Sequence, residues 1–268
     1  MSVPSATRFG SPAALRAAIR AGQFTGPTAG LVPGFVQANL VVVPASAAGD
    51  FAEFCVLNSQ ACPLLAQTEP GNPHPAHVAP GADLRTDVPR YRVFHGGMPE
   101  SDEPTDMRQL WRSDLVAFLL GCSFTFERAL QEAGLSVRHI DEQRNVPMYR
   151  TSVACRPAGV FAGPLVVSMR PYLPEQVPQV IAVTRRFPGM HGAPLQVGNP
   201  AALGIADLAR PDFGDAVTVR PGEVPVFWAC GVTPQLALAA ARLDLAITHS
   251  PGCMFVTDLS DSQFEMET

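Results

Sequence analysis

The sequence predicts an α/β protein of two domains, a discontinuous α/β sandwich with a smaller inserted α+β domain. Short β-branched apolar runs alternate with helical periodicity towards both ends of the chain, which is typical of α/β sheets. The Pro- and Gly-rich stretch at 69–89 indicates an extended surface loop. A chain of 268 residues with 47% hydrophobic content can bury two modest cores. We therefore expect a core domain from residues 1–89 plus 189–268 and an inserted domain from residues 90–188.

The first segment carries a helix, a strand and a second helix. In "SPAALRAAIRAG", Ser11 can cap the helix, Pro12 suits its first turn and Gly22 can end it. The β-branched run "LVVVP" at 40–44 predicts a buried strand. The run "DFAEFCVLN" at 50–58 predicts a second helix. These elements are expected to form scaffold.

The middle segment is expected to combine helices with an antiparallel hairpin. "YRVFHGG" predicts a strand, whereas "SDLVAFLLG" and "SFTFERALQEAG" predict two helices. The runs at 146–155 and 163–171 predict two strands, and their linker suits a hairpin. In "PEQVPQVIAVTRRF", Val177, Val180 and Thr184 share one face of a helix whose early prolines are tolerated.

The last segment returns to a strand, helix, strand order. Apolar runs at 226–229 and 245–248 flank the helical stretch "TPQLALAAAR". A right-handed crossover would make the two strands parallel and bring their carboxyl ends to one edge of the sheet. Cys230 and His249 would then share that edge, where open α/β sheets bind ligands. No internal repeat with a period of 20 to 50 residues is visible.

Composition excludes several classes of function. The net charge is -5, and the 19 basic residues are all arginines scattered along the chain, which argues against a nucleic-acid surface. Without a lysine, the chain cannot form the Schiff base of pyridoxal-phosphate enzymes. No apolar run is long enough to span a membrane and "MSVPSATRFG" lacks a signal-peptide pattern, so we expect a cytoplasmic protein. The six cysteines form no C-x-x-C pair and are expected to be reduced and mostly buried.

Polar residues follow both strands of the last segment. Thr233 opens a helix whose free backbone N–H groups suit a carboxylate, and Ser250 begins a tight turn directly after His249. A cysteine after a strand is more often a core residue than a nucleophile, and a Thr-Pro helix start is usually only a cap. Of these residues, His249 is the one for which a packing role is the weakest explanation, because a histidine at a strand end is seldom needed for packing. Cys230, Thr233, His249 and Ser250 are therefore candidate site residues.

Three further segments hold candidate ligand-binding side chains. In "GCSFTFERA", Ser123 either caps a helix that also carries Glu127 or lines an anion site. In "SMRPY", Arg170 closes an apolar strand, so it either pairs with an acid or holds a substrate carboxylate. In "RFPGMHGAPLQVGNP", His191 and Asn199 belong to a loop without an evident core role. The alternatives for Ser123 and Arg170 stay open from the sequence.

Motifs for a metal or a nucleotide are weak. His74 and His77 have a ligand spacing that suits a helix, but on a Pro-rich loop that spacing means little. Several aspartates could supply oxygen ligands, yet the sequence has no dense carboxylate pattern. The patterns G-x-G-x-x-G and G-K-[ST] do not occur in the sequence. The residues alone leave the metal and the cofactor open.

Six long blocks, in order, carry a family resemblance. They are "GADLRTDVPRYRVF", "GCSFTFERAL", "NVPMYRTSVACRPAGVFAGPLVVSMRP", "HGAPLQVGNPAALGIADLARPDFGD", "GEVPVFWACGVTPQ" and "ITHSPGCMFVTDL". From residue 10 to residue 259 the chain resembles the "putative hydro-lyase" family that includes D-glutamate cyclase. The resemblance implies a two-domain α/β lyase of the carbon-oxygen class. Its best-defined activity closes D-glutamate to 5-oxo-D-proline with loss of water, and manganese is a candidate cofactor.

This ring closure requires a base, an acid and an oxyanion site, because the substrate ammonium must lose a proton and hydroxide must leave as water. We expect His249 to transfer the proton, with His191 as the reserve acid. Cys230 and Thr233 would form the oxyanion site, and Arg170 would hold the α-carboxylate. Further substrate contacts are expected from Ser123, Asn199 and Ser250.

Two rival functions stand beside this one. A hydratase or dehydratase of another small carboxylic acid would need the same carboxylate clamp and acid-base pair. A non-catalytic binding protein for a small amino or oxo acid would bind its ligand without converting it. In each case the partner is a small carboxylate or amino acid, not a nucleic acid or a membrane. We expect a homodimer, the commonest state of soluble oligomers.

Overall fold

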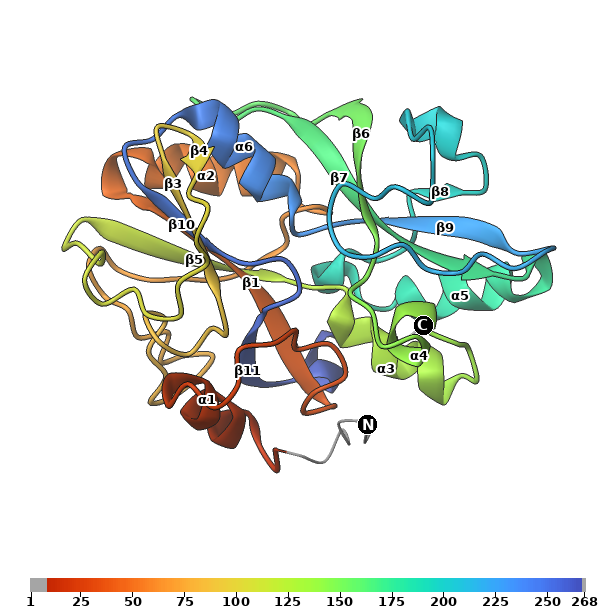
Figure 1. The fold of residues 1–268 in the computed structure, drawn as a ribbon, viewed down its shortest axis with the longest axis horizontal. Helices are drawn as coiled ribbons and strands as arrows, with labels where there is room; N and C mark the ends of the chain where they lie inside the picture. The colour runs from red at the N-terminus through yellow and green to blue at the C-terminus, as the bar shows by residue number, and fades with distance from the viewer. Residues whose placement is uncertain (1–8, 267–268) are drawn as a thin grey trace.

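The computed structural model describes residues 9–266, and its strands form two sheets that lie side by side (Figure 1). The N-terminal stretch that bears on a signal peptide lies almost wholly outside this range. Sheet A has the order β2-β5-β1-β10-β3-β4, with β11 also paired to β1, and sheet B has the order β6-β7-β9-β8. All of these strand pairs are antiparallel.

The strands and helices have the following bounds. Sheet A contains β1 (Phe35–Pro44), β2 (Leu64–Gln67), β3 (Tyr91–His95), β4 (Met98–Pro99), β5 (Leu115–Gly121), β10 (Ala246–His249) and β11 (Phe255–Ser260). Sheet B contains β6 (Met148–Ala154), β7 (Pro164–Tyr172), β8 (Gln196–Val197) and β9 (Val224–Ala229). The α-helices are α1 (Pro12–Arg20), α2 (Ala45–Leu57), α3 (Phe124–Glu132), α4 (Arg138–Asp141), α5 (Val177–Thr184) and α6 (Thr233–Ala241). Short 3-10 segments are η1 (Pro174–Gln176), η2 (Pro188–Met190), η3 (Pro200–Leu203) and η4 (Asp261–Phe264).

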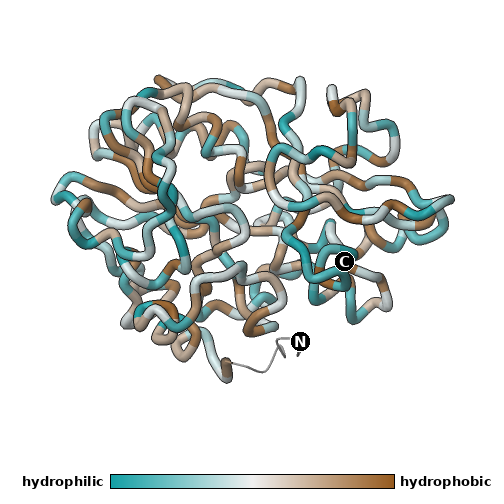
Figure 2. Tube along the Cα trace, in the orientation of Figure 1, coloured by the Kyte–Doolittle hydropathy of each residue, from teal (hydrophilic) through white to brown (hydrophobic). Residues whose placement is uncertain are grey.

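The helices cover one face of each sheet. Helices α2 and α6 pack on sheet A, and α3 and α5 pack on sheet B (Figure 1). The loop after β2 covers the other face of sheet A with Val78, Ala82 and Leu84. Figure 2 shows hydrophobic stretches along the strands of both sheets and hydrophilic segments on the outer loops. The interior of each sheet is thus shielded from water by a helical layer or by loop side chains.

The two sheets repeat one structural unit. In the first half, β1, α2, β2, β5 and α3 occur in this order, with β3 and β4 between β2 and β5. The elements β7, α5, β8, β9 and α6 occur in the same order in the second half. The sheet order β2-β5-β1 correspondingly matches β8-β9-β7. Cys122 and Thr125 follow β5 at the spacing at which Cys230 and Thr233 follow β9. This unit is far longer than the 20 to 50 residues of solenoid repeats, so a search for short periods does not find it.

Each half contributes one strand to the sheet of the other half. Strand β6 follows α3 and α4 in the chain, but it pairs with β7 in sheet B. Strand β10 follows α6 and pairs with β1 in sheet A. The chain therefore crosses between the sheets twice in the same way.

Most predicted elements lie where the sequence places them, and the mixed α/β class is confirmed. Ser11 caps α1 by accepting a hydrogen bond from the backbone N–H of Ala14 at 3.2 Å. The predicted hairpin is β6 and β7, and the predicted strand, helix, strand run near the C-terminus is β9, α6 and β10. Helix α2 begins at Ala45, five residues before the predicted start at Asp50. The six cysteines are free and buried, as expected.

The helix predicted for "SDLVAFLLG" is wrong, because this segment forms strand β5. All seven residues of β5 are buried. Val116 and Phe118 face α2, whereas Leu115 and Ala117 face the loop after β2. A strand that is buried on both faces is a continuous apolar run, and its sequence lacks the alternation that distinguishes a strand from a helix.

The predicted parallel crossover is also wrong. Strand β9 lies in sheet B and β10 lies in sheet A, so the two strands are not neighbours. The local pattern predicts the order of elements correctly, but it contains no information on which sheet the second strand joins. Cys230 and His249 consequently end strands of different sheets.

The predicted domain boundaries do not follow the sheets. Strands β3, β4 and β5 belong to the predicted insert at 90–188, yet they lie in sheet A. Strands β8 and β9 belong to the predicted core segment at 189–268, yet they lie in sheet B. The difference arises because β3, β4 and β5 stay with β1 and β2 in sheet A, and β8 and β9 stay with β7 in sheet B. Among residues 9–266, no helix combines the length and apolar character of a membrane span.

Candidate active site

Arg170 lies at the centre of a buried polar cluster that we call the Arg170 centre, formed with Glu127, Ser123 and His139. The Nε of Arg170 donates to Glu127 Oε1 at 3.1 Å, and its Nη2 contacts the same oxygen. Nη2 also donates to Ser123 Oγ at 3.0 Å, and Nη1 donates to Ser168 Oγ at 3.2 Å. Of the two alternatives for Arg170, the structure shows the ion pair with an acid.

Aromatic rings make the burial of this cation favourable. The guanidinium carbon of Arg170 lies 5.4 Å from the ring centroid of Phe126 and 5.3 Å from that of Trp228, which are cation-π distances. The side chain is 0% exposed. Its charge is therefore fixed in the interior and held by Glu127, and removal of either member would cost about 3 to 5 kcal/mol.

His139 completes the centre, and no motif in the sequence points to it. Its Nε2 lies 3.2 Å from Glu127 Oε1, and its ring stacks on Phe124 at 6.0 Å between centroids. Burial alone would raise the pKa of Glu127, but its interactions with His139 and Arg170 outweigh burial and lower this pKa. Ser123 precedes α3 without a side-chain capping bond, so the capping alternative does not apply.

The two equivalent cysteines lie together beside the Arg170 centre. Cys122 and Cys230 belong to one apolar cluster with Phe124, Met148 and Met254. Backbone N–H groups at the starts of α3 and α6 donate to the two sulfurs. Burial outweighs these bonds, raising the pKa of Cys230 to about 11 and that of Cys122 further. Both side chains are therefore neutral thiols at neutral pH.

His191 joins the two halves of the fold. Its Nδ1 lies 2.7 Å from the backbone oxygen of Gln60, and Gln60 Nε2 donates to the oxygens of His191 at 3.1 Å and Ala193 at 2.9 Å. The backbone of His191 is left-handed, with φ 75°. Burial lowers the pKa of His191 to about 4, and the charge of Arg170 acts in the same direction. His191 is thus neutral, with Nδ1 as the donor to Gln60.

A cavity of about 700 Å³ opens at His191. Gln60, Gly189 and the exposed Arg185 also line it. Within residues 9–266, the structure gives Arg185 no ion-pair partner. Gly121, at the end of β5, packs so closely on Gly189 that a Cβ there would overlap the Gly189 oxygen. The wall of this cavity therefore lies against the strand end that leads into the Arg170 centre.

The predicted residues Thr233, His249 and Ser250 are not members of the Arg170 centre. Thr233 Oγ1 accepts a hydrogen bond from the backbone N–H of Val166 at 3.0 Å. His249 is buried, its Nδ1 lies 2.9 Å from the Ser250 oxygen, and burial followed by the charge of Arg92 lowers its pKa to about 4. The buried Ser250 Oγ has no hydrogen-bond partner in the described part of the chain.

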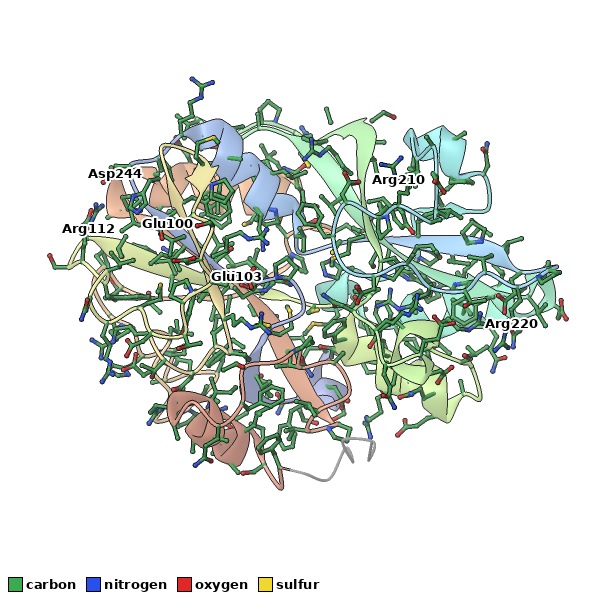
Figure 3. The ribbon with its side chains drawn as sticks, viewed as in Figure 1. Glu100, Glu103, Arg112, Arg210, Arg220 and Asp244 are labelled. Atoms are coloured by element: carbon green, nitrogen blue, oxygen red, sulfur yellow. The ribbon has the colours of Figure 1, made fainter. Side chains whose placement is uncertain are left out.

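The structure therefore brings together one part of the predicted set. Arg170, Ser123, Cys230 and His191 surround the end of β5. Thr233, His249 and Ser250 belong to α6, to β10 and to the turn after β10. Asn199 is exposed in the turn after β8, beside the start of β9 and away from Cys230. Other charged side chains lie at the periphery, as Arg112 and Asp244 do at the outer edge of sheet A (Figure 3).

The side chains do not fit a metal ion. In the described range, no three or more His, Cys, Asp or Glu side chains are grouped so that they could hold one. In the Arg170 centre, Glu127 and His139 are accompanied by a guanidinium, which opposes a second cation at that place. The residues present therefore do not form a manganese site, and no chemical step below passes through a metal.

Comparisons with known proteins give consistent matches over most of the chain. Residues 116–258 match the family model described as D-glutamate cyclase. The chain is 61% identical to a "Putative hydro-lyase" of Rubrobacter xylanophilus, over 96% of this chain and 100% of that protein. Similar proteins with the same kind of name are 56% identical in Bacillus licheniformis, over 94% of this chain and 96% of that protein, and 57% identical in Stutzerimonas stutzeri, over 94% and 95%.

Proposed function

Because this chain belongs to the D-glutamate cyclase family, we propose that it is a carbon-oxygen lyase that closes D-glutamate to 5-oxo-D-proline and releases water. The names of its relatives support the hydro-lyase class. One structural observation carries the proposal further. The cavity of about 700 Å³ is lined by the neutral His191 and adjoins the buried Arg170 centre, so it offers a binding space beside groups that can move protons.

The reaction itself defines what the site must do. A C–N bond forms between the α-nitrogen and the γ-carboxyl carbon, and one C–O bond of that carboxyl breaks. The ammonium nitrogen gives up two protons, and the departing oxygen takes up two protons and leaves as water. No net proton is gained or lost, so the protein has to pass protons from one substrate atom to another.

His191 suits this task because the residue lines the cavity and its ring is neutral. Its pKa of about 4 makes it a weak base in the free protein. A dicarboxylate substrate brings negative charge to the cavity, which raises the pKa of the ring and strengthens it as a base. His249, first in the sequence-based assignment, is equally neutral and remains the alternative proton-transfer group.

Positive charge and backbone donors are available for the substrate carboxyl groups. Arg185 lines the cavity and is proposed to bind the α-carboxylate, a role that the sequence assigned to Arg170. Arg170 instead supplies a fixed positive charge beside the cavity. The start of α6 at Cys230 and Thr233 stays the proposed oxyanion site. Since Val166 engages the Thr233 hydroxyl, backbone N–H groups would serve there.

The proposal is tested by incubating metal-stripped protein with D-glutamate or L-glutamate, with and without manganese. Chiral chromatography with mass detection would identify the product. Formation of 5-oxo-D-proline from the D isomer alone supports the cyclase. Conversion of another small carboxylic acid in a substrate panel would favour a different hydro-lyase. A thermal shift by D-glutamate without any product would favour a binding protein.

A further inference from the structure

We propose that His139, held by Glu127, is a second proton-transfer group of this site and works beside His191. The inference rests on the function proposed above, in which two protons travel from the substrate nitrogen to the departing oxygen. One proton would pass through His191. The other would move from the nitrogen to His139 Nδ1 and then to the departing oxygen, so that both histidines end the cycle neutral.

The position of His139 supports this role. Its side chain is 1% exposed, and Nε2 lies 3.2 Å from Glu127 Oε1. The carboxylate thus lies beside Nε2 of the ring. The ring stacks on Phe124, which belongs to the same cluster as Cys122 and Cys230. His139 thus lies against the apolar cluster that follows the ends of β5 and β9.

The unpaired polar atoms of the pair point to a reacting partner. Within residues 9–266, neither ring nitrogen of His139 nor Glu127 Oε2 has a hydrogen-bond partner, although these atoms are buried. Buried polar atoms in folded proteins are nearly always paired. If Glu127 served only to neutralise Arg170 and His139 served only to fill space, these atoms would be expected to be paired as well. An unpaired Nδ1 next to a fixed carboxylate is instead suited to accept and return a proton.

The test compares His139→Gln and Glu127→Gln with a matched surface control. His95→Gln is that control, because His95 Nε2 also lies 3.2 Å from a glutamate oxygen, that of Glu100, but is exposed. We expect His139→Gln to lower kcat by about a hundredfold with little change in KM. Glu127→Gln should also lower kcat with little change in KM, because the ring loses the carboxylate beside it, and His95→Gln should change neither value. Wild-type kcat in folded His139→Gln or in folded Glu127→Gln would overturn the proposal.

A second measurement tests the proposal if the variants fail to fold or if the protein makes no 5-oxo-D-proline. The ring ¹⁵N signals of His139 in the wild-type protein are followed by NMR while D-glutamate is added. If His139 contacts the substrate, its Nδ1 signal should shift when D-glutamate is added. A shift without any product would contradict the cyclase function but not the placement of His139 in the site. An unmoved His139 signal in protein that binds D-glutamate would remove His139 from the site.

Discussion

At the scale of single residues, two neutral histidines are candidates for the same proton-transfer role. His191 lines the cavity of about 700 Å³, whereas His249 ends β10 with its Nδ1 directed at the Ser250 oxygen. We expect His191→Ala to lower turnover of D-glutamate by about a hundredfold or more, because a proton-transfer step is lost. His249→Ala should retain most of the turnover. The reverse pattern in two folded variants, measured as kcat, would give the role to His249.

The same two histidines make stability depend on pH. Both have a pKa of 6.5 when unperturbed and about 4 in the folded protein, because burial disfavours the imidazolium. The unfolded chain therefore binds more protons between these values, and stability falls as pH decreases from 6.5 to 4. The loss is roughly 3 kcal/mol for each histidine.

Urea unfolding at a series of pH values measures this loss. His191→Gln should flatten the decline between pH 6.5 and pH 4, because it removes one of the two groups. The control His95→Gln changes an exposed histidine and should leave the slope unaltered. An equal slope in wild type and His191→Gln would show that burial does not keep His191 neutral.

The limits of sequence reasoning at this scale are clear from Arg170. The sequence showed that a charge at the end of an apolar strand needs a partner, and Glu127 was already noted. It could not show that they meet, because α3 and β7 are joined only by packing across the fold. His139 was missed for the same reason, since its helix of four residues carries no motif and its partner lies in another helix.

At the scale of elements, short apolar segments were the least predictable. The hairpin of β6 and β7 and the helices α1, α3 and α6 follow from periodicity and from cap residues. Strand β5 does not, because burial on both faces removes its alternation. Whether such a segment forms a strand or a helix can be predicted only when its neighbours in the fold are known. The neighbours of β5 in the sheet are β1 and β2.

The contact between β5 and η2 predicts an effect of a single methyl group. In Gly121→Ala, the added Cβ would overlap the backbone oxygen of Gly189, and backbone cannot move aside cheaply. We expect destabilisation by about 1 to 3 kcal/mol, as in other overpacked sites. Gly49→Ala in α2 is the control, because nothing lies within 4 Å of its Cβ position.

The measurement is chemical unfolding of both variants beside the wild type. The control should gain roughly 0.5 to 1 kcal/mol, because alanine favours a helix over glycine. If Gly121→Ala is as stable as the wild type, the close approach of β5 and η2 that positions His191 does not exist in solution.

At the scale of the whole molecule, the exchanged strands couple the two sheets. Strand β6 ties the first half to sheet B, and β10 ties the second half to sheet A. Unfolding of either half of the chain would remove a strand from the sheet of the other half. We therefore expect one cooperative unfolding transition, with the same midpoint by far-UV circular dichroism and by tryptophan fluorescence, although Trp228 lies in sheet B and Trp111 beside sheet A. Two separated midpoints would show that the sheets unfold independently.

The order of elements in the repeated unit can be derived from the sequence, but the partners of its exchanged strands cannot. The Cys-x-x-Thr spacing after β5 and β9 is visible in the printed sequence, and a comparison at a period of about half the chain could have found it. Which sheet β6 and β10 join depends on contacts between distant segments. That dependence is why the predicted edge with Cys230 and His249 did not form.

The matching halves also have a consequence for ancestry. A half-length ancestor that formed a dimer would have exchanged the strand that β6 and β10 now represent. In the contact between its two copies, one residue would have faced its twin, the same residue of the other copy. Gln60 and His191 occupy those twin places after α2 and α5. Fusion of two such copies into one gene would let the twins diverge, and the pairing of Gln60 with His191 presents an imidazole on one side only.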